Sequence, residues 1–470
     1  MRKNAPLIYA QKQLEKAQVM VLPSLLDMSI KFLVDNIKKF DKEFVKNNIG
    51  PVRKEMLERM LKMVDNHGLT CDGQANHLEK MWEILPCLIN SKSYTELDFG
   101  DLTTSKECES CIWSNNCFQE FIRCLGTNTP NLRQLIIVIP NFEWCDFEYS
   151  LEERELNSII QLKNLAILDI EDVRVPLSGI FDICRRCEKL ERIHAEAVII
   201  DVELSSAAFG DDFAYICIKE SDYSRQISLD MKRTVPTTDP KYEVNTHYVR
   251  LYLKPKRNKD LFLAQEFATK LREIQVDFSK LEGMEEMAGF PHLPQIKCAR
   301  FVCGGKSAHA LRCFLKRNGE SLLELDLFDV DSKDKMTFGE IFTFCPNLKS
   351  LELFACTLVG NDAPVDAMQQ LKRFKWRWLN RYVFDEVAFS SILSAPLLED
   401  IYIDLPKIDF SDNATIIARI QRRDILRNLK KIEMDEMMID IPFEENHSSY
   451  LTRFTDLKNA FASAISAGPL

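Results

Sequence analysis

A seven-residue pattern recurs along most of this 470-residue chain and restricts the folds that the chain can adopt. The pattern is x-Leu-x-x-φ-x-φ, in which φ stands for an apolar residue. Its clear copies begin at Asn131, Asn164, Lys189, Lys270, Ser321, Asn347, Gln370, Leu397 and Asn428, and its weaker copies begin at Ser93 and Gln295. From Lys270 onward the copies start 23 to 31 residues apart. Alternating apolar residues predict short strands, and a strand with one apolar face needs neighbouring repeats to bury it.

The segments between these strands predict helices. The sequences LSGIFDICRRC and FGEIFTFC both place Ile-Phe ahead of a cysteine, so Cys187 and Cys345 occupy the same repeat position, just before a strand. Leucine-rich repeats have a period of about 20–29 residues. Over roughly residues 90–440 the layout resembles the cysteine-containing leucine-rich repeats common in ubiquitin-ligase receptors. The resemblance implies an α/β fold, a leucine-rich-repeat solenoid of short parallel strands and helices.

The pattern weakens between residues 189 and 270, where only the segments from Tyr223 and His247 keep it. We expect degenerate repeats with longer loops at about 200–265, and a separate small insert is the alternative. The expected domains are an all-helical module at 1–90, the solenoid at 91–445 and a C-terminal cap or tail at 446–470.

The first module carries a second resemblance. Ser24 is a predicted N-cap, and the segment SLLDMSIKFL that it opens resembles the elongin BC box, a helix that binds an elongin-C-type adaptor. This resemblance implies that the adaptor contacts Leu25, Leu26, Ser29, Phe32 and Leu33, with serine where the box more often has cysteine. Ile49, Pro51 and Val52 resemble a degenerate cullin box. In that family an apolar residue directly precedes the proline, whereas here Gly50 lies between Ile49 and Pro51. The arrangement is similar to Zyg-eleven-type substrate receptors of cullin–RING ubiquitin ligases.

Two other interpretations of the first module stay open. The segment from Val21 through Pro23 also resembles the start of an F-box, which docks on the Skp adaptor, but the Val-Cys-x-x-Trp-like segment of that family is missing and Trp82 comes too late. Alternatively, the helices at 20–64 form a plain cap that seals the first repeat, because a terminal repeat exposes its core without one.

Composition excludes several functional classes. The chain has 61 Lys and Arg against 71 Asp and Glu, a net charge of −10, which argues against general nucleic-acid binding. No secretory signal opens the sequence, and its longest tight apolar run, Leu135 to Ile139, is too short to cross a membrane. We therefore expect a soluble cytoplasmic or nuclear protein whose 15 cysteines are mostly free thiols.

The sequence does not predict an enzyme. Its seven histidines do not cluster, and it contains none of the common catalytic or dinucleotide-binding motifs. Cys108, Cys111, Cys117 and Cys124 are the best zinc candidates, but only one pair has metal spacing and no histidine lies near. We expect neither a metal nor a cofactor.

The strand faces that point away from the core predict a binding surface. The strand from Gln370 predicts a basic row made of Lys372, Arg373, Lys375 and Arg377, with Trp376 inward. The next strand predicts an acidic row made of Glu399, Asp400, Tyr402 and Asp404. The rows have two readings, as ions that pair only with each other or as a recognition strip with Tyr402 as an aromatic anchor. The predicted substrate contacts are Arg373, Lys375, Arg377 and Tyr402.

The expected function is that of a non-catalytic substrate-recognition subunit of a cullin–RING ubiquitin ligase. Residues 21–64 would bind an elongin-C-type adaptor and a cullin, and the repeats would bind an unknown protein substrate. An F-box receptor on the Skp adaptor and a leucine-rich-repeat scaffold with no ubiquitin role are the alternatives.

Overall fold

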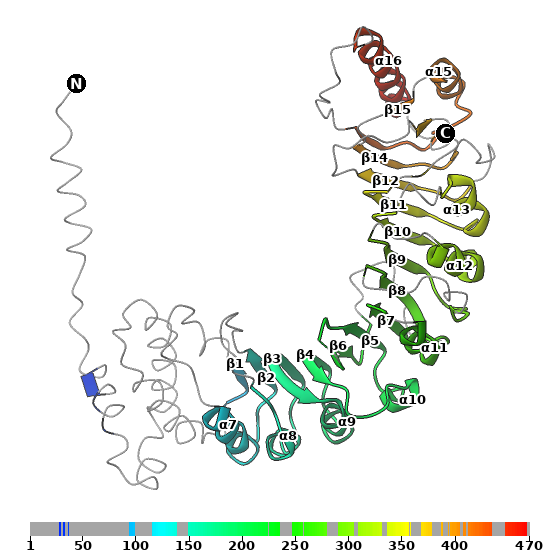
Figure 1. The fold of residues 1–470 in the computed structure, drawn as a ribbon. Coiled ribbons are helices and arrows are strands. Elements are labelled where there is room, and N and C mark those ends of the chain that lie inside the picture. Colours follow the sequence, from blue (N-terminus) through cyan, green and yellow to red (C-terminus); the bar gives the residue numbers. More distant parts are fainter. Residues whose placement is uncertain are drawn as a thin grey trace, which may run out of the picture. The chain divides into compact units, whose positions relative to one another are not determined.

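The fold is seen in a computed structural model (Figure 1). The residues that it describes are 28, 29, 32, 36, 94–98, 115–138, 149–223, 225–235, 247–256, 258–279, 290–304, 309–330, 336–356, 358, 368–377, 387–388, 393, 395–404, 408–409, 412–434 and 447–467. The chain divides into two compact units, 1–174 with 182–189 and 175–181 with 190–470, and each is described by itself. The division falls within strand β3 and helix α9.

The first unit is an alternation of parallel strands and helices. Its elements are β1 (Glu96–Asp98), α7 (Asn115–Asn128), β2 (Gln134–Val138), α8 (Glu153–Ile160) and β3 (Ile167–Pro176), followed by α9 (Leu177–Arg186). The strands pair in the order β1-β2-β3, in parallel. Their register aligns Leu97 with Leu135 and Leu135 with Leu168, and all three leucines are buried. The predicted repeat leucines therefore form one continuous apolar row.

The second unit carries most of the repeats. Its strands are β4 (Arg192–Ile199), β5 (Tyr215–Glu220), β6 (Gln226–Lys232), β7 (Tyr248–Leu253), β8 (Leu271–Asp277), β9 (Cys298–Val302), β10 (Glu324–Phe328), β11 (Ser350–Phe354), β12 (Arg373–Arg377), β14 (Asp400–Asp404) and β16 (Lys431–Met434). They pair in the order β4-β6-β5-β7-β8-β9-β10-β11-β12-β14-β16, while β13 (Val387–Ala388) and β15 (Ile408–Asp409) form a separate pair.

Helices and helical turns connect these strands. They are α10 (Ser206–Phe209), η4 (Asn258–Leu261), α11 (Phe262–Glu266), α12 (His309–Asn318), η6 (Gly319–Ser321), α13 (Phe338–Phe344), α15 (Asn413–Gln421) and α16 (His447–Ser466). Figure 1 shows α12 and α13 on the same side of the neighbouring strands. None of the helices that the structure describes combines the length and the apolarity needed to cross a membrane.

The strand register confirms the predicted repeat. From β8 to β14 every strand pairs in parallel with the next, and the register aligns Leu325 with Leu351, then with Phe374 and Ile401. All four of these side chains are buried. The predicted α/β fold with short parallel strands and helical connections is therefore present, whereas the predicted all-helical module at 1–90 lies outside the described residues, apart from a few helical positions near residue 30.

The aromatic core lies between the helices and the strands. The ring of Phe314 in α12 lies 4.7 Å from that of Phe301 in β9, and the ring of Phe338 in α13 lies 5.4 Å from that of Trp376 in β12. Burying large aromatic side chains removes much apolar area from water, which is the main source of stability here. Cys345, at the end of α13, is also buried, as expected for a small apolar residue at the repeat position before a strand.

The asparagine that opens several copies of the pattern links successive repeats. The Asn347 side-chain amide donates a hydrogen bond of 2.9 Å to the Glu320 carbonyl, one repeat earlier. In the first unit Asn164 makes the equivalent bond of 2.9 Å to the Pro130 carbonyl. Since a turn leaves carbonyl groups without partners in the sheet, this side chain satisfies one of them in these two repeats.

The irregular middle at about 200–265 differs in part from the degenerate repeats expected there. The segment from His247 forms the repeat strand β7, which runs parallel to β5. The segment from Tyr223, however, forms β6, which lies between β4 and β5 and runs antiparallel to both. It is therefore not a degenerate repeat strand. Alternation in sequence specifies a buried strand face but not the strand direction, so β6 could be recognised as a strand and not as the return arm of a hairpin.

Candidate binding surface

The strands β8 to β16 present a second face, opposite the buried one, which we call the polar face. Its side chains form three rows across the strands. The first row consists of Glu273, Cys298, Glu324, Ser350, Arg373, Asp400 and Lys431. The second consists of Gln275, Arg300, Asp326, Glu352, Lys375, Tyr402 and Glu433. The third consists of Asp277, Val302, Phe328, Phe354, Arg377 and Asp404.

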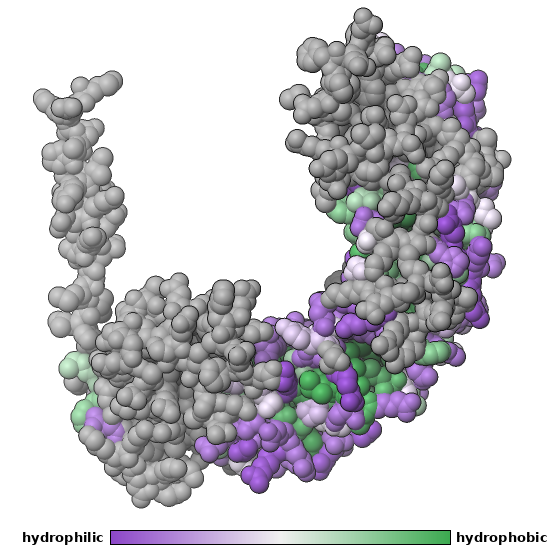
Figure 2. All heavy atoms as spheres, in the orientation of Figure 1, coloured by the Kyte–Doolittle hydropathy of each residue, from purple (hydrophilic) through white to green (hydrophobic). Residues whose placement is uncertain are grey.

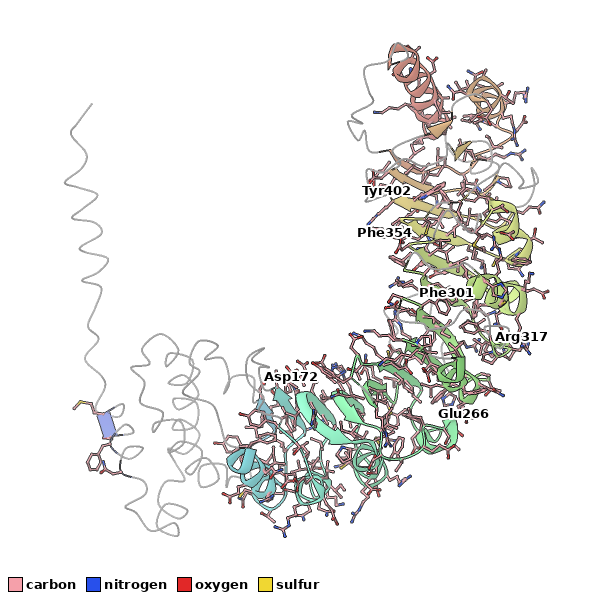
Figure 3. The ribbon with its side chains drawn as sticks, in the orientation of Figure 1. Asp172, Glu266, Phe301, Arg317, Phe354 and Tyr402 are labelled. Atoms are coloured by element: carbon pink, nitrogen blue, oxygen red, sulfur yellow. The ribbon has the colours of Figure 1, made fainter. Side chains whose placement is uncertain are left out.

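The polar face points away from the helices. Within each strand its residues alternate with buried ones, and in β12 Phe374 and Trp376 are buried while Arg373 and Arg377 are exposed. In Figure 3 the labelled Phe354 and Tyr402 lie on the strand side and Arg317 on the helix side. On the helix side, the described residues that Figure 2 shows at the surface are mostly hydrophilic. The inward position predicted for Trp376 is therefore correct, and the predicted basic row faces outward.

The first two rows contain ion pairs between strands. Arg373 Nη2 lies 2.8 Å from Glu324 Oε1 on β10, two strands away, and Lys375 Nζ lies 3.8 Å from Glu352 Oε2 on β11. On the neighbouring strand β9, Arg300 pairs with an acid of the same row on β10, at 2.8 Å. Arg373 and Lys375 of the predicted basic row therefore pair with acids on β10 and β11, whereas Lys372 pairs with Glu399 of the predicted acidic row. Paired surface ions of this kind contribute little to stability.

The second and third rows together form an aromatic–arginine patch, defined by Arg300, Phe328, Phe354, Arg377 and Tyr402. The Arg377 guanidinium carbon lies 4.9 Å from the Tyr402 ring centroid, and that of Arg300 lies 5.7 Å from the Phe328 ring centroid. The rings of Phe328 and Phe354 lie 5.5 Å apart. All three aromatic side chains are half-buried. Among the described residues no carboxylate lies within ion-pair distance of Arg377, although Asp404 is its register partner on β14, and its guanidinium contacts the Tyr402 ring.

Sequence reasoning found two members of this patch, Arg377 and Tyr402, and missed the other three, Arg300 and the two phenylalanines. Phe328 and Phe354 are the residues that follow the seven-residue pattern in SLLELDLF and NLKSLELF. A signal was available, since in a strand every second residue shares a face, and Phe328 lies two residues after the outward Asp326. The seven-residue pattern ends at its last buried position, so it does not include the outward-facing residue that follows.

Lys372 and Glu399 do not belong to the rows, which corrects the expected composition of the basic and acidic rows. The strands begin at Arg373 and Asp400, so both residues precede a strand. They form a separate cluster in which Lys372 Nζ lies 3.3 Å from Glu399 Oε1 and Lys430 donates to Glu399 Oε2. The hydrogen bond from Lys430, followed by that from Lys372, holds the pKa of Glu399 below its ordinary value.

A second polar cluster lies on β5, β7 and β8. Arg250 Nη2 pairs with Glu273 Oε1 at 2.7 Å, and its guanidinium carbon lies 4.8 Å from the Tyr252 ring centroid. Burial raises the pKa of Cys217 to about 11 and that of Tyr252 to about 12. Both side chains are therefore neutral near pH 7, and a neutral thiol is a poor nucleophile. This cluster has the character of a packed polar surface.

Two deeply buried cysteines lack the features of a reactive thiol. Burial raises the pKa of Cys345 and of Cys356 to about 12. Cys124 and Cys184 are half-buried and form no disulfide among the described residues. Of the four zinc candidates, Cys108 and Cys111 lie outside the described residues, and so does the side chain of Cys117. The expectation that no metal is bound stays a prediction.

Most of the predicted adaptor contacts lie outside the described residues. These are Leu25, Leu26, Leu33, Ile49, Pro51 and Val52. Ser29 and Phe32 are described and helical, and the Phe32 side chain is 61% exposed. Met28, four residues before Phe32, is 58% exposed. Residues four apart share a helix face, so two large apolar side chains are exposed next to each other.

Comparisons with known proteins find only remote structural similarities. No protein-family model and no curated protein matches the chain. An internalin from Listeria monocytogenes is similar in structure at 11% identity with a TM-score of 0.33, over 79% of this chain and 91% of the internalin. The TLR13–ssRNA13 complex is similar at 14% identity with a TM-score of 0.30, over 66% of this chain and 53% of that chain, about half its length. TM-scores this low carry no argument, so the fold assignment rests on the repeat register.

Proposed function

We propose that this chain is a non-catalytic protein-interaction protein that binds a partner protein on the polar face of its repeats. The observation that carries the proposal is the aromatic–arginine patch. Arginine, tyrosine and other aromatic residues are enriched where protein interfaces hold most of their binding energy. Half-buried rings already have fixed orientations, so a partner loses little conformational entropy of the receptor when it binds them.

The ion pairs around the patch indicate which kind of protein surface would complement it. Arg300, Arg373 and Lys375 each have a carboxylate partner within the chain, so the first two rows offer alternating charge and not one sign. A partner with a strongly acidic or basic surface would have to displace these pairs. The best complement is a protein surface with an apolar or aromatic centre and a mixed polar rim.

We further propose that the protein works as a substrate receptor of a cullin–RING ubiquitin ligase in the cytoplasm or nucleus. In this proposal the segment at 21–64 binds an elongin-C-type adaptor, and the repeats bring the substrate close to the ligase, which raises its effective concentration. Support comes from the resemblance of the SLLDMSIKFL segment to the BC box and from the exposure of Met28 and Phe32 on one helix face.

The adaptor proposal is tested with purified proteins. The full chain, its Leu25→Asp variant and its Phe32→Asp variant are each incubated with elongin B–C and, separately, with the Skp adaptor. The proposal expects capture of elongin B–C by the wild type and its loss in both variants, with unchanged circular dichroism. Phe32→Asp is the sharper variant, because a side chain that is 61% exposed can be replaced without disturbing a core.

Other outcomes would redirect the adaptor proposal. Capture by the Skp adaptor alone would mean an F-box-type receptor. If neither adaptor binds, and Leu25→Asp lowers the unfolding midpoint, the helix is a cap, and the chain is a scaffold without a ubiquitin role. The polar-face proposal is independent of these results, since it concerns other residues.

A further inference from the structure

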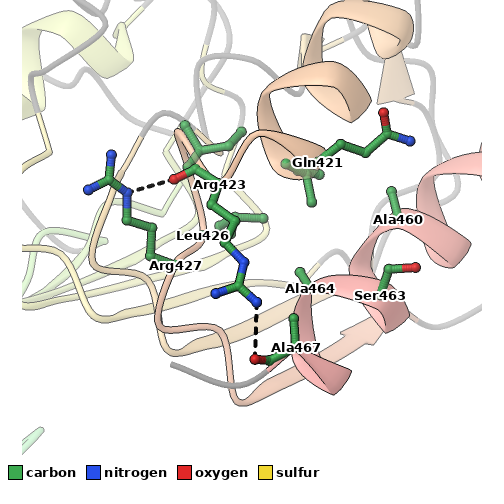
Figure 4. A pocket seen from close by; sticks show the side chains of 10 residues that line it. Gln421, Arg423, Leu426, Arg427, Ala460, Ser463, Ala464 and Ala467 are labelled. Carbon is green, nitrogen blue, oxygen red and sulfur yellow. Dashed lines mark hydrogen bonds between the residues drawn. The ribbon is translucent and has the colours of Figure 1, made fainter. Parts of the chain in front are cut away.

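The end of the second unit contains a hollow between α15 and α16 (Figure 4). Its volume is about 210 Å³. Pockets for drug-sized molecules measure about 300–1,000 Å³, so this hollow has room for one large side chain and its immediate neighbours. It lies apart in sequence from the aromatic–arginine patch and depends on none of its residues.

The walls of the hollow are mostly apolar, with Gln421 and Ser463 as uncharged polar exceptions. Ile420, at the end of α15, and Leu426, in the loop that follows it, are both buried. On the facing side α16 contributes Ala460 and Ala464, which share one face of that helix because they are four residues apart. Small alanine side chains leave space that larger residues would fill, and an apolar space of this size favours an apolar side chain over water.

Two guanidinium groups lie at the rim. Arg423 Nη2 donates to the Ala467 carbonyl over 3.0 Å, and Arg427 Nε donates to the Arg423 carbonyl over 2.6 Å (Figure 4). Both acceptors are neutral, and within the described part of the chain neither arginine pairs with a carboxylate. The positive charge at the hollow is therefore not compensated, and guanidinium groups bind carboxylates with charge-assisted hydrogen bonds.

Three cations close to these arginines in sequence do have acidic partners in the chain. Arg422 lies 2.9 Å from Asp424, Lys431 lies 2.6 Å from Glu433, and Lys430 pairs with Glu399. These three cations, which are close in sequence to Arg423 and Arg427, thus have acidic partners in the chain. In a protein with a net charge of −10, two uncompensated arginines beside an apolar space mark a place of complementary charge for an acidic ligand.

The backbone at the rim is held in an unusual conformation. Helix α15 ends with the Asp424 amide bonded to the Arg419 carbonyl and the Arg423 amide bonded to the Ile420 carbonyl, both at 2.9 Å. In this type of helix end the left-handed position usually holds glycine, but here it holds Arg423, with φ of 60°, and Leu426 also has a positive φ of 56°. Backbone strain of this kind concentrates at ligand-binding sites.

We propose that the hollow between α15 and α16 binds a short segment of a partner protein in which an Asp or Glu neighbours a large apolar residue. The apolar side chain fills the space beside Ile420, Leu426 and Ala464, and the carboxylate accepts hydrogen bonds from Arg427 and Arg423. The apolar walls favour a peptide over a nucleic-acid backbone, whose phosphates need polar walls. This site is separate from the polar face and does not rest on the proposed function.

The test uses a displayed library of random seven-residue peptides, selected on the full-length protein. The Arg423→Gly, Arg427→Gln double variant serves as the counter-selection. The proposal expects enriched peptides with Asp or Glu next to Leu, Ile, Met or Phe. A fluorescein-labelled enriched peptide should then bind the wild type, as measured by fluorescence anisotropy, and lose affinity about tenfold or more with Arg427→Gln, since charged hydrogen bonds are among the strong ones.

Single variants distinguish the contribution of the arginine charges to binding from that of the apolar space. Arg423→Gly should weaken binding without lowering the unfolding midpoint, because glycine relieves the positive φ. Ala464→Leu should also abolish binding, because it fills the hollow while keeping a good helix former and both arginines. Arg422→Gln is the matched control, since this arginine does not line the hollow and pairs with Asp424; its affinity should equal that of the wild type.

Several results would overturn the proposal. The first is a library with no enrichment on the wild type over the double variant. The second is enriched peptides without acidic residues, or peptides that bind Ala464→Leu as tightly as the wild type. The third is displacement of the labelled peptide by a single-stranded oligonucleotide or by phosphatidylserine vesicles, with the same dependence on Arg427, which would assign the site to a phosphate ligand.

Discussion

The two faces of the second unit's sheet carry different residues and different interactions. On the helix-covered face Trp376 is buried, its indole N–H donates to the Cys356 carbonyl over 3.2 Å, and its ring packs against Phe338. On the polar face the adjacent residue Lys375 reaches only a carboxylate, at 3.8 Å. Two neighbouring residues of one strand, Lys375 and Trp376, thus lie at the surface and in the core, respectively. We infer that one face determines stability and the other is free to bind.

The largest expected effect comes from removing the central core side chain. Trp376→Ala should lower the free energy of unfolding by about 3–5 kcal/mol, because it leaves a cavity and an unpaired carbonyl. Urea unfolding followed by circular dichroism measures this loss. Lys375→Ala is the matched control on the other face, where a change within about 0.5 kcal/mol is expected. Equal losses in the two variants would contradict the division into two faces.

Close packing between repeats gives the next effect. A Cβ added at Gly319 would lie 2.4 Å from the Phe344 carbonyl oxygen and 2.9 Å from Cys345 Sγ. Because the nearest atom belongs to the backbone, it cannot move aside as a side chain would. Gly319→Ala should therefore cost about 1–3 kcal/mol of unfolding free energy. A variant as stable as the wild type in the same urea titration would mean that the repeats are packed less tightly than described.

A smaller effect comes from the link between α12 and α13. The Glu340 carboxylate accepts two hydrogen bonds from Arg312, at 2.9 and 3.0 Å, and one from the Thr337 amide, which completes a capping box at the start of α13. Glu340→Ala should lower the free energy of unfolding by about 1–2 kcal/mol. Glu320→Ala, an exposed control, should leave it unchanged. A double-mutant cycle with Arg312→Ala that shows no coupling would refute the link.

The smallest effect concerns the exposed cluster around Glu399. Its two lysine partners hold the pKa of Glu399 below the ordinary value. A lowered folded-state pKa stabilises the fold above the ordinary pKa of about 4.3, and the contribution is lost as the pH falls through the folded value. Glu399→Gln should therefore be slightly less stable than the wild type at pH 7, and this deficit should shrink as the pH falls below the ordinary pKa. A deficit that does not shrink with falling pH would assign the effect to something other than charge.

The sequence predicted the buried face better than the polar face. Each repeat strand was located by its leucine or other apolar residues, because burial leaves a periodic signal in the chain itself. The partners on the polar face are set by stacking. Arg373 pairs with Glu324, 49 residues earlier and two strands away, and no local pattern connects them. The direction of β6 and the hollow at α15 and α16 were missed for the same reason, since both arise from packing between distant segments.

The central claim is that a partner protein binds the aromatic–arginine patch, and photo-crosslinking tests it most directly. A photoreactive phenylalanine derivative is placed at Tyr402 on the polar face and, in a second protein, at the exposed Lys316 on the helix side. We predict that Tyr402 gives a discrete crosslinked partner in cells, that Arg377→Glu abolishes this adduct, and that Lys316 gives no such adduct. A partner crosslinked at Lys316 alone, or an adduct at Tyr402 that is unaffected by Arg377→Glu, would contradict the account.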